Sequence, residues 1–199
     1  MRIRSQPVRE AIVRATMDLI ANGRLADAGL VNICKAAGVS RGALYHHFVS
    51  IGEVVAEIHA RAQDRVFELA ERSFANAGAD APARFSVALG RALAEDRLVR
   101  AGLQLAADGT EAPPRLRDEI LARVHDEVLA AARDRSDRRV LADLAVVVTA
   151  GLESLGYADT AWWNSQNAGR IWDMVLPLFT EAERTVAGRE RDAAADLPR

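Results

Sequence analysis

The sequence predicts an all-α protein with an N-terminal three-helix head, built around a helix-turn-helix, and a C-terminal helical body. Three observations predict this fold class. Alanine and leucine, which favour helices, are abundant in the 199 residues, whereas only 5% of the residues are aromatic. Apolar residues recur at helical spacing along most of the chain. Two short helical segments, 30–37 and 41–47, are separated only by a turn.

The head is expected to contain three helices, over about 7–22, 30–37 and 41–47. Pro7 suits the start of the first helix, and Asn22-Gly23 suits its end. Gly38 can adopt the left-handed backbone that ends the second helix, and Ser40 is a good cap for the third. A helix-turn-helix of this kind places its second helix in the major groove of DNA. A helical hairpin in an unrelated bundle is the alternative, and it gives no role to Tyr45, His46 and His47.

The body is expected to begin with a long helix, because Ser50 and Glu53 form a capping box and an apolar stripe follows them. Residues 76–80 are expected to break this helix. Further helices are expected over about 82–96, 97–107, 115–134, 141–155 and 160–179. The segment 141–155 is apolar on so many sides that a partner is expected to cover it.

The C-terminal helix carries its own signals. Asp159 or Thr160 is expected to cap it. Pro177 is expected to bend it, and the charged tail after Gly188 is expected to fray.

Residues 37–48, Ala-Gly-Val-Ser-Arg-Gly-Ala-Leu-Tyr-His-His-Phe, resemble the core motif of TetR-family transcriptional regulators. The resemblance implies a DNA-binding domain, here 1–50, and a ligand-binding and dimerisation domain, here 51–199. It also implies that the exposed face of the third helix contacts bases and phosphates, while Leu44 and Phe48 pack inside the head. The residues expected at the DNA are Lys35, Ser40, Arg41, Gly42, Tyr45 and His46.

The charge distribution agrees with a head that binds DNA. Residues 1–50 carry seven basic and three acidic side chains, a net charge of +4, so the rest of the chain carries −6. A basic N-terminal part on an acidic body fits a nucleic-acid-binding domain joined to a domain with another task.

Two departures from the family pattern concern DNA affinity. TetR proteins commonly have a phosphate-binding lysine where Ile51 stands, and many have a threonine or serine where Ala28-Gly29 stand. Fewer phosphate contacts predict weaker DNA binding with a shallower dependence on salt.

A second resemblance lies in the body. Residues 98–106, followed by Pro113-Pro114, are similar to the corresponding stretch of γ-butyrolactone receptors, which are TetR-type regulators of antibiotic production. Those receptors usually carry a tryptophan shortly after the prolines, and 115–134 contains none. The resemblance implies a small-molecule effector, for which the absent tryptophan favours an antibiotic-pathway metabolite over a butyrolactone.

A mainly apolar ligand with one or two polar groups is expected between the helices of the body. By helical phase, Gln104 and His125 are the polar side chains best placed for it. The walls are expected to come from Phe85, Leu89, Leu103, Val128, Val147, Trp162 and Trp163. Packing in the core or at a dimer interface is the alternative role for the two tryptophans.

Other function classes find no support in the sequence. Cys34 is the single cysteine and is expected to be a small buried residue. The four histidines lack metal-ligand spacing, so neither a metal nor a cofactor is expected. Phosphate loops and nucleophile elbows are absent, which argues against an enzyme. Without an apolar run of membrane-spanning length, the chain is expected to be cytoplasmic.

The sequence therefore predicts a ligand-responsive repressor that binds a pseudo-palindromic operator as a homodimer and leaves it when a small-molecule effector binds. One alternative is a regulator whose body only dimerises. Another is a helical ligand-binding or dimerisation protein whose DNA binding is weakened or lost.

Overall fold

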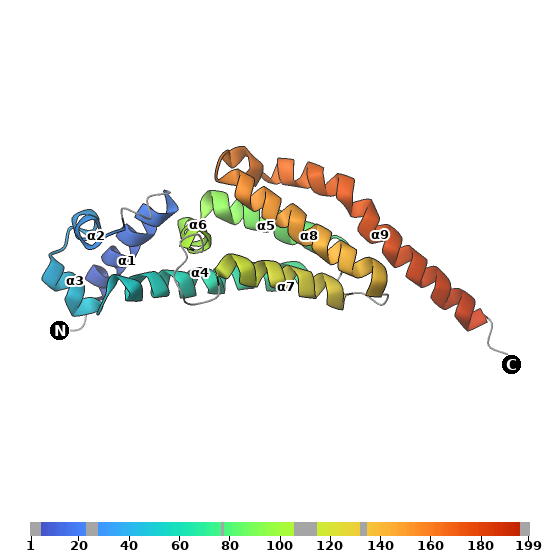
Figure 1. Cartoon of the computed structure of the whole chain (residues 1–199), viewed down its shortest axis with the longest axis horizontal. Coiled ribbons are helices and arrows are strands. Elements are labelled where there is room, and N and C mark those ends of the chain that lie inside the picture. Colours follow the sequence, from blue (N-terminus) through green and yellow to red (C-terminus); the bar gives the residue numbers. More distant parts are fainter. Residues whose placement is uncertain (1–4, 23–27, 77, 106–114, 132–134, 196–199) are drawn as a thin grey trace. The chain divides into compact units, whose positions relative to one another are not determined.

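The computed structural model describes residues 5–22, 28–76, 78–105, 115–131 and 135–195, and these contain helices but no strand, as the sequence predicts. The elements are α1 (Ser5–Ala21), α2 (Leu30–Ala37), α3 (Arg41–His47), α4 (Ile51–Phe74), α5 (Ala81–Glu95), α6 (Arg97–Gln104), α7 (Leu116–Ala130), α8 (Arg135–Gly156), the 3₁₀-helix η4 (Thr160–Trp163) and α9 (Ser165–Ala195) (Figure 1). The all-α class is confirmed.

Contacts divide the chain into two compact units. Unit 1 comprises Met1–Phe67 and Glu95–Asp118, and unit 2 comprises Glu68–Ala94 and Glu119–Arg199. These units differ from the two functional domains, 1–50 and 51–199, that the sequence predicts. The functional boundary at residue 50 stays a prediction.

Unit 1 is built on one apolar core. Its helices contribute fully buried aliphatic side chains at helical spacing, among them Ile12, Ile20, Ile33, Leu44, Val54 and Ile58. Cys34 is buried beside them, as expected. Because α1 contacts α2, α3 and α6, its apolar face holds the three short helices of this unit in place.

A close helix approach in unit 1 is made at Gly102 of α6. A Cβ atom at this position would overlap the Cβ of Ala62 on α4 and press on the side chain of Leu116. Since alanine is rigid, the two helices would have to move apart.

We expect Gly102→Ala to lower the free energy of unfolding by about 1–3 kcal/mol, because it overpacks a buried helix crossing. Gly42→Ala is the matched control, since a Cβ at Gly42 would meet only the Ser40 hydroxyl, at the ordinary contact distance of 3.9 Å. That change should raise stability by about 0.4–1 kcal/mol. Urea unfolding of both variants checks the pair, and equal effects would contradict the close packing of α6 on α4.

Unit 2 packs around large aromatic side chains. Trp163 is buried, donates from Nε1 to the backbone oxygen of Glu153 at 3.0 Å, and meets the ring of Tyr157 edge-on with centroids 5.0 Å apart. Gly156 makes room for it, because a Cβ there would overlap the indole. Trp172 is also buried and lies beside Phe179, with ring centroids 5.9 Å apart.

The prediction of one helix over 160–179 is wrong, because this segment contains the 3₁₀-helix η4 followed by the start of α9. Asp159 accepts from the backbone nitrogen of Ala161 at 2.9 Å and thereby caps η4. Asn164 then accepts from the backbone nitrogen of Gln166 at 2.8 Å, where α9 begins. Pro177 lies inside α9.

Three other boundaries differ from the sequence prediction by four residues or more. The helix expected over 141–155 begins six residues earlier, at Arg135, in a polar segment without an apolar signal. The last helix continues to Ala195, where a frayed tail was expected. The helix expected over 115–134 ends at Ala130. The break expected between the helices over 97–107 and 115–134 lies outside the described residues.

Candidate nucleic-acid interface

The turn between α2 and α3 forms as the sequence predicts. Gly38 has φ 66°, the left-handed conformation, and so ends α2. Ser40 caps α3, because its Oγ accepts from the backbone nitrogen of Ala43 at 3.1 Å. Gly29 precedes α2 without a side-chain cap, as the departure from the family pattern indicated.

Two buried anchors orient α3. Leu44 and Phe48 are buried in the core of unit 1, which turns the opposite face of the helix toward solvent. Tyr45, one residue after Leu44, is 54% exposed. The short helix therefore presents a face that is fixed by its own core contacts.

The structure places the six residues predicted to contact DNA on α2, the turn and α3. All are exposed: Lys35, Ser40, Arg41, Gly42, Tyr45 and His46. Ser40 also serves as the helix cap, so its hydroxyl has a structural task in addition to any contact. A Cβ atom at Gly42 would meet only the Ser40 hydroxyl, at 3.9 Å, which leaves the backbone accessible there. Their roles at DNA stay predictions.

Two exposed valines beside this surface are not among the residues that the sequence predicts to contact DNA. Val49, which follows α3, is 87% exposed, and Val31 in the first turn of α2 is 58% exposed. Apolar residues are ordinarily assigned to the core, so only the structure reveals them. An exposed methyl group can contact the methyl group of thymine.

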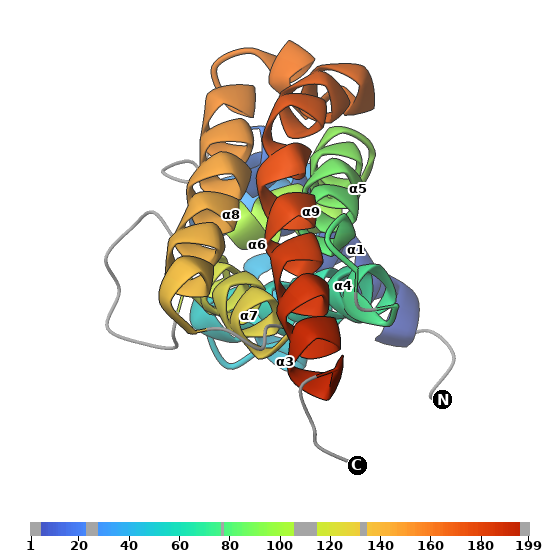
Figure 2. The ribbon, with the colours of Figure 1, turned by 90° about the vertical axis from the view of Figure 1, so that its right-hand side faces the viewer.

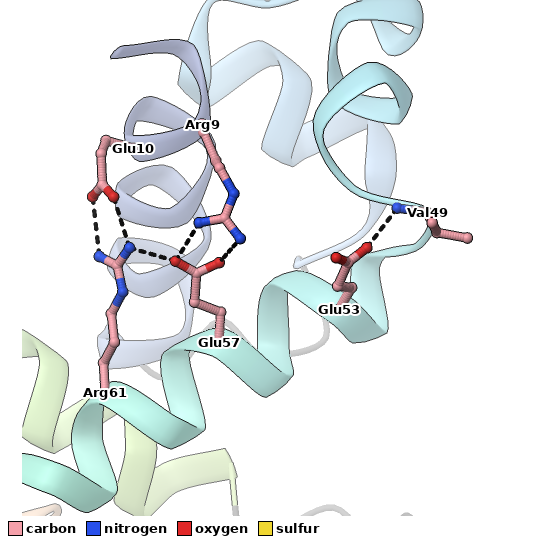
Figure 3. Close-up of polar contacts among 6 residues, drawn as sticks. All are labelled: Arg9, Glu10, Val49, Glu53, Glu57 and Arg61. Atoms are coloured by element: carbon pink, nitrogen blue, oxygen red, sulfur yellow. Dashed lines mark hydrogen bonds and ion pairs between the residues drawn. The ribbon is translucent and has the colours of Figure 1, made fainter. Parts of the chain in front are cut away.

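The start of α4 corrects the predicted capping box in one detail. Ser50 Oγ accepts from the backbone nitrogen of Glu53 at 3.3 Å, as expected. The carboxylate of Glu53, however, accepts from the backbone nitrogen of Val49 at 2.7 Å (Figure 3). Ile51 is half-buried and packs against the core of unit 1.

A network of four charges joins α1 to α4 (Figure 3). Arg61 donates to both oxygens of Glu10, at 2.6 and 3.0 Å, and also contacts Glu57. Arg9 donates to Glu57 at 2.6 Å, and its guanidinium lies 4.6 Å from the centre of the Phe48 ring. The sequence could not show this network, because its partners are 48 and 51 residues apart.

The network also shifts the pKa values of Glu10 and Arg61. The hydrogen bond from Arg61 lowers the pKa of Glu10, and burial opposes it. The same bond raises the pKa of Arg61. Because the folded-state pKa of Glu10 is depressed, its contribution to stability is present above the unfolded pKa and is lost as the pH falls through the folded value. Solvent screening keeps this contribution small, since Glu10 is half exposed.

The predicted ligand residues are divided between the two units, and their role in ligand binding stays a prediction. Leu103 and Gln104 belong to unit 1, whereas the others belong to unit 2. Phe85, Val128 and Trp163 are buried, and Val147 is 66% exposed.

The remaining three ligand residues have distinct surroundings. His125 lies beside Asp126 and Asp143, with nitrogen–oxygen distances of 3.3 and 3.6 Å. Leu89 and Trp162 line a crevice in unit 2. All nine ligand-binding assignments stay predictions.

Within the described part of the chain, His, Cys, Asp and Glu side chains form no group of three that could hold a metal ion. In the same part, every helix is too short or too polar to cross a membrane.

The chain is similar in sequence to bacterial regulators. Residues 12–58 match the family described as "Bacterial regulatory proteins, tetR family". Over 65 residues the chain is 32% identical to the HTH-type transcriptional regulator UidR of Escherichia coli, and equally so to UidR of Shigella flexneri. The match covers 33% of this chain and 33% of UidR, so the chain spans about a third of the length of the curated relatives it matches.

Solved structures share the fold over most of the chain. One is a gamma-butyrolactone receptor described as ArpA-like, with a TM-score of 0.67 and 18% identity over 92% of this chain and 100% of that chain. Another is CprB from Streptomyces coelicolor in complex with its biological operator sequence, with a TM-score of 0.67 and 22% identity over 92% and 98%. A third is the SmeT–triclosan complex, with a TM-score of 0.61 and 20% identity over 85% and 90%. At these identities the likeness establishes a shared fold.

Proposed function

Since residues 12–58 belong to the tetR family of bacterial regulatory proteins, we propose that this chain is a transcriptional repressor that binds operator DNA through α3. The observation that carries the proposal is the capped helix α3, whose buried Leu44 and Phe48 hold Arg41, Tyr45 and His46 at the surface. Arginine can read guanine or hold phosphate, and the other two side chains can donate to either. Such a regulator works in the cytoplasm, where the DNA of a bacterium lies.

We further propose that it acts as a homodimer on a pseudo-palindromic operator. Exposed apolar side chains occur on both α8 and α9, which lie side by side in unit 2 (Figure 2). They are Val140, Val147, Met174 and Leu178. Covering them with a second copy would remove apolar surface from water and pair two copies of α3 for successive major grooves.

A small-molecule effector is the third part of the proposal. Structures with the same fold include a gamma-butyrolactone receptor and SmeT with triclosan, and unit 2 of this chain has helices enough to enclose a ligand. Binding would favour a conformation that the operator does not match, so the DNA would be released.

The alternative is a helical ligand-binding or dimerisation protein whose DNA binding is weakened or lost. Two observations favour it. Ile51 is packed against the core where a phosphate-binding lysine commonly stands, and Gly29 offers α2 no side-chain cap.

A gel-shift experiment with the DNA upstream of the chain's own gene separates the two functions. A specific complex that resists competitor DNA supports the repressor, and the slope of affinity against salt reports how many phosphates it contacts. Affinity for this DNA no higher than for random DNA, at every salt concentration, would favour the alternative.

Ile51→Lys is expected to strengthen operator binding and to steepen its salt dependence by about one counterion per subunit. The long aliphatic part of lysine can keep some of the core packing while the ammonium group reaches solvent. Ala60→Lys adds the same charge at an exposed position further along α4 and is the control. Identical salt slopes for both variants and the wild type would show that position 51 lies away from the DNA backbone.

A further inference from the structure

Unit 2 contains a crevice among α5, α8, η4 and α9 that the sequence prediction located only in part. Its lining consists of Ser86, Leu89, Gly90, Leu93, Thr149, Leu152, Glu153, Trp162 and Ala168. The residues from α5 recur every three or four positions, as do those from α8, so each helix contributes one face. The space between the atoms amounts to about 210 Å³, part of it open to solvent, and none of it admits a water molecule.

Two hydroxyl groups make this crevice unusual. Ser86 is 3% exposed and Thr149 is 1% exposed, and neither hydroxyl has a hydrogen-bond partner among the described residues. A hydroxyl in a helix can bond to the carbonyl oxygen one turn earlier, as Thr16 does to Ile12 at 2.9 Å. Leaving a buried hydroxyl unpaired costs free energy, and a partner inside the crevice would recover it.

The rest of the lining limits what that partner can be. Leucine, alanine and glycine positions form most of the wall, and the half-buried Trp162 closes one side, so the body of a ligand has to be apolar. Glu153 also lines the crevice and is 6% exposed, and its carboxylate accepts from Ser154 at 3.1 Å. A carboxylate in a poorly solvated place repels an anion.

We infer that this crevice is a binding site for a small uncharged molecule with an apolar body and one oxygen atom that accepts hydrogen bonds from both Ser86 and Thr149. A carbonyl oxygen has two lone pairs and can accept both bonds at once. Because the crevice has no room even for a water molecule, the ligand is compact and enters by displacing side chains such as Trp162. As the description of an effector, this inference rests on the proposed function.

The probe for this site is cyclohexanone, a compact apolar ring with one carbonyl group, titrated into the ¹⁵N-labelled full-length protein. Backbone amide shifts are expected to change along 86–93 and 149–153. The double variant Ser86→Ala, Thr149→Val should bind the probe about tenfold more weakly, because it removes both donors. Cyclohexanecarboxylate, which has the same ring and a negative charge, should cause no saturable shifts.

Thr16→Val is the matched control, because it makes the same change at a buried position in unit 1. It should leave probe binding unchanged but lower the melting temperature, since Thr16 loses its bond to Ile12. The double variant should melt at or above the wild-type temperature, because it breaks no hydrogen bond between described residues. A lower melting temperature would assign the two hydroxyls to structure and overturn the proposal.

Other outcomes are equally decisive. Wild-type affinity in the double variant, or shifts confined to residues outside α5, α8, η4 and α9, would overturn the site. Saturable binding of the carboxylate would overturn the assigned ligand class. The titration contains no DNA, so probe binding at this site by a protein that fails to shift its operator would refute the repressor and leave the site standing.

Discussion

Tyr45→Ala is expected to reduce operator affinity by about thirtyfold or more while leaving helical content unchanged. The ring is 54% exposed on α3, so its removal leaves the core intact. A good base or stacking contact contributes about 1–3 kcal/mol, and a homodimer would lose two of them. Their sum, about 2–6 kcal/mol, corresponds to a loss of about thirtyfold to ten-thousandfold. His46→Ala is expected to act in the same direction.

Fluorescence anisotropy with labelled operator DNA measures this loss, and circular dichroism measures helical content. Tyr157→Ala is the matched control, because Tyr157 is the only other tyrosine and lies in unit 2. It should bind the operator like the wild type. If Tyr45→Ala also keeps wild-type affinity, α3 does not present the DNA-reading surface.

The double variant Val147→Asp, Met174→Asp is expected to turn a dimer into a monomer at micromolar concentration. Val147 is 66% exposed on α8 and Met174 is 82% exposed on α9. Burying a charge without a partner at each of these positions in a dimer interface would cost several kcal/mol. Gly151→Arg is an independent variant on α8, since a Cβ at Gly151 meets only open space within unit 2.

Sedimentation velocity distinguishes the two states. Ala158→Asp adds a charge at an exposed position after α8 and should leave the dimer intact. Operator affinity should fall together with the dimer, because a single α3 reaches only one half-site. A wild-type monomer at micromolar concentration would contradict the proposed assembly itself.

Much of unit 1 was predictable because its signals are local. The conformation of Gly38, the cap at Ser40 and the burial of Leu44 and Phe48 follow from residues that are close in sequence. Backbone preferences and caps act within one turn of a helix, so a short string of residues specifies them. The helix α3 was predicted with its observed boundaries for this reason.

The surroundings of the candidate ligand residues could not be predicted from the sequence, because helical phase is lost across uncertain breaks. Gln104 belongs to unit 1, and Val147 is 66% exposed. The adjacent tryptophans differ in their surroundings: Trp162 lines the crevice and Trp163 is buried against α8. A 3₁₀-helix between α8 and α9 separates their directions, and the sequence predicted a continuous α-helix there.

By itself, the sequence determined the all-α class, the helix-turn-helix and the exposed face of α3, because hydrophobic spacing and capping are properties of neighbouring residues. Only the tertiary structure decided which distant groups meet. It joined Arg9 and Arg61 to Glu57, and it left the hydroxyls of Ser86 and Thr149 in one crevice without partners among the described residues. These arrangements depend on how whole helices pack, and packing is set by the shape of every side chain at the contact.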